Sequence, residues 1–266
     1  MEVALAIALG LVIGAALGSL GGGGSILAVP VLVYIAGQEP KAATATSLVA
    51  VAAAAVGGVV GHARADRVRW GAAAAFVATG VGGAWLGSRV NGSIDEDLLL
   101  LGFSALILLA AHRMLTACPS CTKVGEDLAV AASGEGRAAR LDVAGIVRVV
   151  LAGSAVGFLT GLFGVGGGFI IVPALTLALG MSMPIAIGTS LAIIVGNALV
   201  TLGFRGVDAV EWSIAVPFTV TMLIGSAVGS SLGHKLPPER SLRAFATLLV
   251  LVAVANGIAA GIALAG

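Results

Sequence analysis

The sequence predicts an all-α polytopic membrane protein made of two inverted repeats, each with four spanning helices and a glycine-broken half-helix hairpin. The 266 residues are 59% hydrophobic and only 10% charged, whereas soluble domains carry about 25% charged residues. No charged residue occurs between Val3 and Gln38 or between Val149 and Phe204. Apolar stretches of this length are typical of membrane-spanning helices. A glycine cluster interrupts each of the two charge-free runs.

The two glycine clusters belong to an internal repeat. Residues 10–48 and 153–191 match without a gap, 143 residues apart, with 14 identities over 39 positions. The matches include the clusters themselves, the Val-Pro pairs at 29–30 and 172–173, and the Thr-Ser-Leu triplets at 46–48 and 189–191. A duplicated, glycine-broken apolar segment indicates the binding site of a transporter.

Apolar segments divide the chain into two similar halves. We predict helices at 3–20, 42–61, 70–90 and 97–115, with a short helix at 26–37, and again at 143–163, 185–204, 212–232 and 241–264, with a short helix at 169–180. The first repeat is thus 1–115, a cytoplasmic linker is 116–142, and the second repeat is 143–266. The first helix lacks a preceding basic region and has an internal copy, so we interpret it as structure rather than as a signal peptide.

The short helices decide the topology. Each has about a dozen residues, too few to span roughly 30 Å of hydrocarbon at 1.5 Å per residue. They either enter the membrane and return, or complete broken spanning helices. If they return, three basic segments lie on one side of the membrane: the loop at 62–69, the linker, and the loop between helices 212–232 and 241–264, with Lys235, Arg240 and Arg243. The acidic segments 95–97 and 205–211 then lie on the other side.

Lysine and arginine mark the cytoplasmic side, so loop charge favours the returning, inverted arrangement over a parallel one. Both termini then lie outside a bacterial or archaeal cytoplasmic membrane. Lys41 and Arg89 are exceptions on the outer side.

The start of each short helix is the predicted binding region. Its first amides lack helical partners and carry partial positive charge, and glycine allows close approach of a ligand. Two such ends that meet would bind an anion without a charged side chain. The predicted substrate-binding residues are Gly22, Gly23, Gly24, Ser25, Thr46, Ser47, Gly166, Gly167, Gly168, Thr189, Ser190 and Asn197.

Structural roles remain open for these residues. The glycine clusters are alternatively tight turns, the hydroxyls alternatively bond to backbone, and Asn197 alternatively joins helices by a hydrogen bond. The spaced glycines at 10, 14 and 18, and their copies at 153, 157 and 161, form small-xxx-small patterns that favour helix packing.

Other function classes find little support in the sequence. A net charge of +1 predicts no nucleic-acid partner, and neither GxGxxG nor a P-loop is present. Cys118 and Cys121 form a lone CxxC pair, interpreted as two reduced thiols because a zinc site needs four ligands. His62, His112 and His234 fall near helix ends or in loops, so we expect them to be solvated and no histidine base to lie at membrane depth. We therefore predict neither an enzyme nor a cofactor or metal.

The duplicated glycine-rich hairpin, followed by Val-Pro and by Thr-Ser-Leu on the next helix, resembles the TauE/SafE sulfite exporter family. Most of the specificity lies in residues 161–173, GLFGVGGGFIIVP; the first copy departs by having four consecutive glycines and Ser25. The resemblance implies a permease for sulfite, sulfonates or other small sulfur-containing or organic anions. Members of the family differ in what they carry, so it assigns no substrate.

The predicted mechanism follows from the missing charges. Proton-coupled carriers hold a carboxylate or histidine at membrane depth, and we expect none here. An inside-negative potential favours anion exit. The sequence thus predicts an exporter that works by alternating access around a midplane site; an anion channel and a membrane assembly or scaffold protein are the alternatives. Coupling, oligomeric state and a role for Arg205 in the site stay open.

Overall fold

A computed structural model describes residues 2–20, 25–91, 96–116, 143–163, 168–205, 208, 210–233, 240, 243–251 and 253–254. The first half contains α1 (Glu2–Leu20), α2 (Ser25–Pro30), η2 (Val31–Ile35), α3 (Pro40–Arg64), α4 (Trp70–Asn91) and α5 (Glu96–Thr116). The second half contains α7 (Val143–Phe163), α8 (Gly168–Pro173), η3 (Ala174–Ala178), α9 (Met183–Arg205) and α10 (Trp212–Gly233). Every element in the described part of the chain is helical, and each boundary lies within three residues of its prediction.

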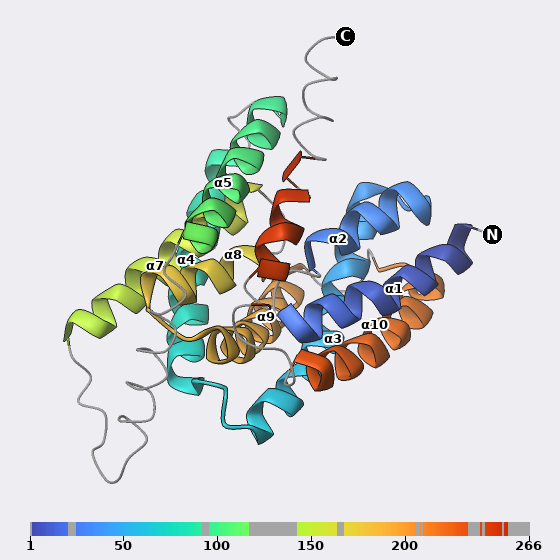
Figure 1. Ribbon diagram of the computed structural model, residues 1–266. Coiled ribbons are helices and arrows are strands. Elements are labelled where there is room, and N and C mark those ends of the chain that lie inside the picture. The colour runs from blue at the N-terminus through green and yellow to red at the C-terminus, as the bar shows by residue number, and fades with distance from the viewer. Residues whose placement is uncertain are drawn as a thin grey trace.

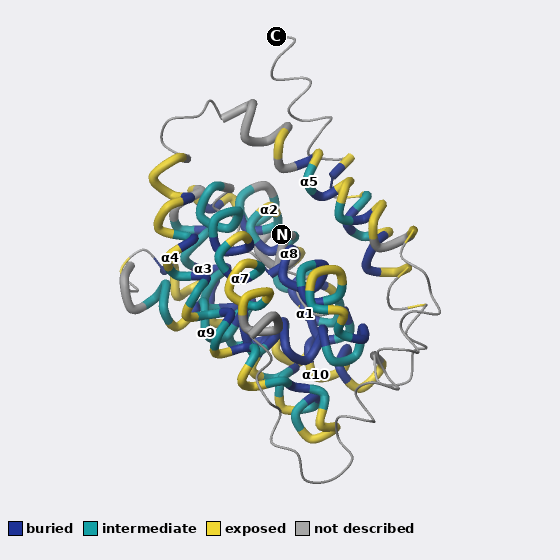
Figure 2. The backbone as a smooth tube through the Cα atoms, turned by 90° about the vertical axis from the view of Figure 1, so that its left-hand side faces the viewer, coloured by how far each residue is buried: buried dark blue, intermediate teal, exposed yellow. Residues whose placement is uncertain are grey.

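The helices form a bundle with an apolar outer surface. Three of them are long and apolar enough to cross a membrane: Ala42–Arg64, Met183–Leu202 and Trp212–Leu232. Shorter apolar stretches lie at Ile7–Leu20, Ser104–Arg113 and Val147–Leu162. Large apolar side chains such as Leu11, Val220 and Leu199 are exposed, and exposed faces occur on the outer sides of the helices (Figure 2). A lipid bilayer accommodates such a surface.

Tryptophans and arginines mark the ends of α4. Trp70 and Trp85 are both more than half exposed and lie fifteen residues apart, about 22 Å along a helix. The Arg89 guanidinium lies 4.8 Å from the centroid of the Trp85 ring. Arg69 and Arg89 bracket the helix at a separation of about 30 Å, which equals the hydrocarbon thickness of a bilayer. Although α4 is not among the three helices that qualify by length and apolarity, aromatic residues at both interfaces are typical of the spanning helix predicted at 70–90.

The two short helices end in the same way. Pro30 and Pro173 lack an N–H and so disturb the α-helical hydrogen bonds, and a π-helical turn, η2 or η3, follows each of them. Gly37 (φ 69°) and Gly180 (φ 64°) then take the left-handed conformation that ends many helices. The following N–H groups, of Gln38 and Met181, each donate to a carbonyl six residues back at 3.0 Å.

Glycines lie where a helix of one half packs closely against a helix of the other half. In Figure 1, α1 lies alongside α10 and α7 lies alongside α4, and the same pairs are in contact. A Cβ added at Gly14 would overlap the backbone of Met222, and one added at Gly157 would overlap the backbone of Gly80. Gly18 and Gly161 continue the two seams toward Ser226 and Ala84. The small-xxx-small glycines therefore pack helices, as predicted.

The order of these contacts gives the helix directions. Gly57 and Gly58 of α3 approach Leu223 and Ser226 of α10, so the residue numbers rise together along the two helices. The same holds for the contacts of α1 with α10. Consequently α1, α3 and α10 run in the same direction.

α9 runs against this group of helices. Gly58 of α3 approaches Leu191, whereas His62, four residues later, lies against Gly188. Because one residue number rises as the other falls, α3 and α9 are antiparallel.

The glycine seam generates the first prediction. Gly157→Ala should destabilise the protein by about 1–3 kcal/mol, since the added methyl has no space against the Gly80 backbone. Gly82→Ala is the matched control: no atom lies within 4 Å of its added Cβ, and alanine favours the helix by up to about 1 kcal/mol. Thermal unfolding in detergent measures both, and equal midpoints for the two variants would contradict the seam.

Candidate functional site

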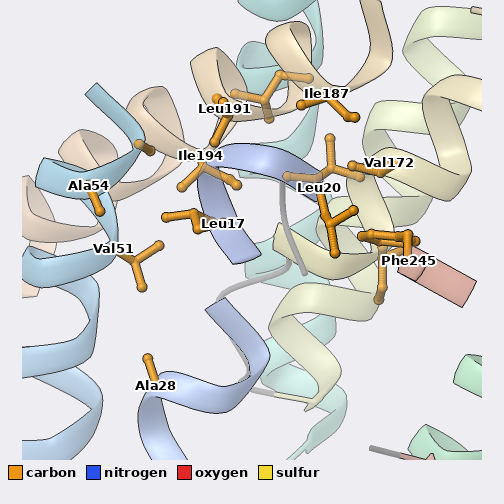
Figure 3. Close-up of a cluster of buried hydrophobic side chains, with 14 of the residues drawn as sticks. Leu17, Leu20, Ala28, Val51, Ala54, Val172, Ile187, Leu191, Ile194 and Phe245 are labelled. Carbon is orange, nitrogen blue, oxygen red and sulfur yellow. The ribbon is translucent and has the colours of Figure 1, made fainter. Parts of the chain in front are cut away.

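The two short helices meet between the halves. α2 and α8 contact each other and lie in the middle of the bundle (Figure 1). Ala28 of α2 and Ile171 of α8 are fully buried, and Gly168, the first residue of α8, is buried too. Figure 3 shows the apolar side chains around this contact, including Leu17, Leu20, Val172 and Ile194. Gly22, Gly23, Gly24, Gly166 and Gly167 lie outside the described residues, as does the side chain of Ser25.

The two predicted threonines each hold the start of a helix from the other half. Thr46 Oγ1 of α3 accepts a hydrogen bond from the Glu211 N–H, just before α10, at 3.4 Å. Thr189 Oγ1 of α9 accepts one from the Arg69 N–H, just before α4, at 3.1 Å. Both threonines are completely buried. These bonds satisfy helix N-terminal donors that a buried helix end must pair.

The neighbouring serines are buried as well. Ser47 is 5% exposed and Ser190 is fully buried. Ser190 Oγ donates to the Ile187 carbonyl of its own helix at 2.8 Å, which leaves the lone pairs of the hydroxyl oxygen as acceptors. Asn197, the remaining predicted residue, is half-buried in the middle of α9.

The structure does not bring the two hydroxyl pairs together. Gly188, beside Thr189, packs against His62, and His62 follows Thr46 by sixteen residues on the same helix. This places the pairs about 24 Å apart along α3. One small ligand therefore cannot contact both pairs at once, and Ser47 and Ser190 belong to different levels of the bundle.

His62 corrects one prediction. We expected it to be solvated, but it is only 2% exposed, because Gly188 of α9 and α1 cover the end of α3. Its Nε2 lies 3.4 Å from the Gly18 carbonyl. That carbonyl is one of the last in α1, where helical donors are lacking and a side-chain donor is favourable. His112, in contrast, is exposed as predicted.

Charged side chains gather at the two ends of the bundle. Among the described residues, no Asp, Glu, Lys or Arg is buried. Arg64, Arg67 and Arg69 lie at one end, at and just after the end of α3. Glu39, Asp208 and Glu211 lie at the opposite end, where α3 and α10 begin. In the described part of the interior between these ends, the polar groups are hydroxyls, backbone groups, the half-buried amide of Asn197 and the imidazole of His62. The described residues also contain no cluster of three metal-binding side chains.

Sequence reasoning missed a polar contact at the acidic end. Gln38 Nε2 donates to Glu211 Oε2 at 2.9 Å, and Gln38 is 5% exposed. The two residues lie 173 positions apart. The counterpart of Gln38 is Met181, and the counterpart of Glu211 is Arg69 when α4 and α10 are aligned at Trp70 and Trp212, which are 142 residues apart. These counterparts are of different types, so the repeat did not identify the pair. The only indication in the sequence was that Gln38 directly follows Gly37, a glycine that both halves of the repeat share.

Comparisons with known proteins agree with this architecture. A family model described as "Sulfite exporter TauE/SafE" matches residues 6–256, which include both halves. The chain belongs to the TauE/SafE sulfite exporter family.

Relatives of this chain carry a transporter description. Two proteins of Xylella fastidiosa, from strains 9a5c and Temecula1 / ATCC 700964, are each 37% identical over 246 residues, covering 91% of this chain and 90% of theirs. Both are described as "Probable membrane transporter protein". No solved structure matches the chain significantly.

The threonine contacts generate the second prediction. Thr189→Val should destabilise the protein by about 1 kcal/mol or more, because the buried Arg69 N–H loses its acceptor. Thr189→Ser, which keeps the hydroxyl, is the matched control and should lose less. Thermal unfolding in detergent compares the two. A valine variant as stable as the serine variant would show that this bond does not hold the start of α4.

Proposed function

We propose that the protein exports small anions, sulfite or related sulfur-containing or organic anions, by alternating access between two inverted halves. The observation that carries this proposal is the contact of α2 with α8 between halves whose equivalent helices run in opposite directions. Each short helix follows a glycine cluster and starts inside the bundle. In secondary transporters, broken helices at the junction of inverted repeats form the substrate site.

Three features support the inverted topology. α3 and α9, which are equivalent in the repeat, are antiparallel in their contacts. α1 and α3 run in the same direction, as they must if α2 and η2 return the chain across part of the membrane. The arginines of the α3–α4 loop mark the cytoplasmic end by the positive-inside rule, so Glu211 and the N-terminus lie outside.

Anion recognition is assigned to helix starts and hydroxyls. The interior of the described bundle has no buried Lys or Arg, but the first amides of the run α2–η2 and of the run α8–η3 present partial positive charge. Ser190 lies two residues after Gly188, which packs against His62, and His62 in turn contacts Gly18 near the end of α1. Ser47 is the equivalent of Ser190 in the repeat and lies toward the opposite end of α3. The anion would pass these two levels in turn.

The membrane potential supplies a driving force for export. Outward movement of one negative charge gains about 2.3 kcal/mol per 100 mV when the inside is negative. No carboxylate among the described residues is shown to be buried, so proton coupling through this part of the bundle would depend on His62.

Flux in proteoliposomes tests the function and is the third prediction. Sulfite, sulfate, thiosulfate, sulfoacetate and small carboxylates are compared with and without a potential, against protein-free liposomes. We expect at least one anion to show saturable flux that exchanges with unlabelled anion and accelerates with the potential. Non-saturable current without exchange would indicate a channel, and absence of both flux and binding would indicate a scaffold or assembly protein.

The serine hydroxyls generate the fourth prediction. Ser190→Ala and Ser47→Ala should each weaken anion affinity by roughly 0.5–3 kcal/mol, the value of a neutral or charge-assisted hydrogen bond. Ser88→Ala, at an exposed position of α4, is the matched control and should leave affinity unchanged. Half-saturation of flux measures all three. A loss of binding in Arg205→Gln with Ser190→Ala silent would assign recognition to the arginine instead.

A further inference from the structure

The two ends of the bundle carry equivalent pairs of loops that differ in the side-chain contacts across them. At the cytoplasmic end, an open cavity of about 540 Å³ is lined by residues 68–72, at the start of α4, and by residues 179–182 and 185, between η3 and α9. In the repeat these segments correspond to 210–214 and to 36–39 and 42. At the outer end, segment 36–39 is joined to segment 210–214 by the hydrogen bond between Gln38 and Glu211.

The backbone framework of the two loop pairs is the same. Gly180 and Gly37 share the left-handed conformation, and Thr189 and Thr46 bind the N–H groups of Arg69 and Glu211. The difference lies in the side chains. Gln38 and Glu211 bond across the outer pair, whereas their counterparts, Met181 and Arg69, line the cavity instead.

The exchange of Glu211 for Arg69 also reverses the charge. Arg69 is the only charged residue in the described lining of the cavity, which is otherwise apolar apart from Ser182. Arg69 is half-buried, and a cation beside a low-dielectric wall attracts an anion from the cytoplasm more strongly than a fully solvated one. The carboxylate of Glu211 does the opposite at the outer end, where it disfavours re-entry of a released anion.

We propose that the cavity is the entrance where the anion is captured, with Arg69 as its charged contact, and that the equivalent outer loops are an exit gate closed by the Gln38–Glu211 bond. This inference rests on the proposed transport function. In it, the described conformation is open toward the cytoplasm, and export requires the outer bond to break while the loops around Arg69 approach each other.

Sided cysteine labelling tests the gates without any substrate and is the fifth prediction. In a Cys118→Ser, Cys121→Ser background, Ile185→Cys reports on the cavity and Ala42→Cys, its equivalent, reports on the outer loops. A membrane-impermeant maleimide is applied to either face of vesicles. We expect Ile185→Cys to react from the cytoplasmic face and Ala42→Cys to react slowly from outside.

Loss of the gate bond should change both reporters in opposite directions. Glu211→Ala should raise outside labelling of Ala42→Cys by roughly tenfold, the effect of one charge-assisted hydrogen bond, and lower labelling of Ile185→Cys. Asp208→Ala removes an exposed carboxylate from the same loop and is the matched control. Glu211→Gln keeps an acceptor for Gln38 and should change labelling less. Gln38→Leu provides a second route to the same result if Glu211→Ala does not fold.

Anion capture at Arg69 has its own measurement. Sulfoacetate should slow labelling of Ile185→Cys, and Arg69→Gln should raise the concentration required by roughly tenfold, as expected for loss of one charged contact. Arg67→Gln, in the same loop but outside the cavity lining, is the control. If sulfoacetate protects Ile185→Cys from labelling equally in Arg69→Gln and Arg67→Gln, the assignment of the cavity as the anion entrance is wrong.

The outcomes separate the two proposals. Saturable flux with unchanged labelling in Glu211→Ala and Gln38→Leu would overturn the gate and leave the transport function standing. Reciprocal labelling without flux of any tested anion would support the gate and contradict the function. Labelling of Ile185→Cys from the outer face only would overturn the assignment of the cavity to the cytoplasm.

Discussion

The close approach of α1 to α10 and of α7 to α4 is the constraint on which the rest of the fold depends. Lipid tails compete with side chains for apolar contact, so helix association in a bilayer depends on van der Waals packing of close backbones. Glycines at 14, 18, 157 and 161 permit that approach. Each seam joins one helix from each half, so neither half completes its packing alone, and the short helices α2 and α8 are enclosed where the halves meet.

Enclosure places demands on every polar group inside. Backbone donors in a bilayer must find partners within the protein, and Thr46 and Thr189 satisfy this demand at the starts of α10 and α4. His62 serves the C-terminal end of α1 in a similar way. A fixed charge in this interior would be costly and would hold an anion tightly. Hydroxyls and helix starts attract an anion more weakly, which suits a carrier that must release what it binds.

The helices and the repeat could be predicted from the sequence because charge gaps and glycine clusters are local signals. The register between helices could not, because no local signal says that His62 lies beside Gly188 or that Thr46 lies about 24 Å from that level. His62 was assigned to solvent because it is near a helix end, but helix ends in a bundle are covered by neighbouring chain. The contact between Gln38 and Glu211 was not predicted, because the predicted site consisted mainly of residues that the two halves share, and the two halves differ at these positions.

The bond between Gln38 and Glu211 would affect the apparent affinity for an anion measured from each side of the membrane. In the proposed transport cycle, a contact present in one half and absent from the other would make the inward-open and outward-open states unequal in free energy. If the bias toward the cytoplasm is roughly tenfold, only about one empty carrier in ten is available to an external anion, and the apparent affinity from outside is weaker by about the same factor. Two faces built from the same repeated segment would thereby differ in affinity for the same ion, in addition to the difference in charge between Arg69 and Glu211.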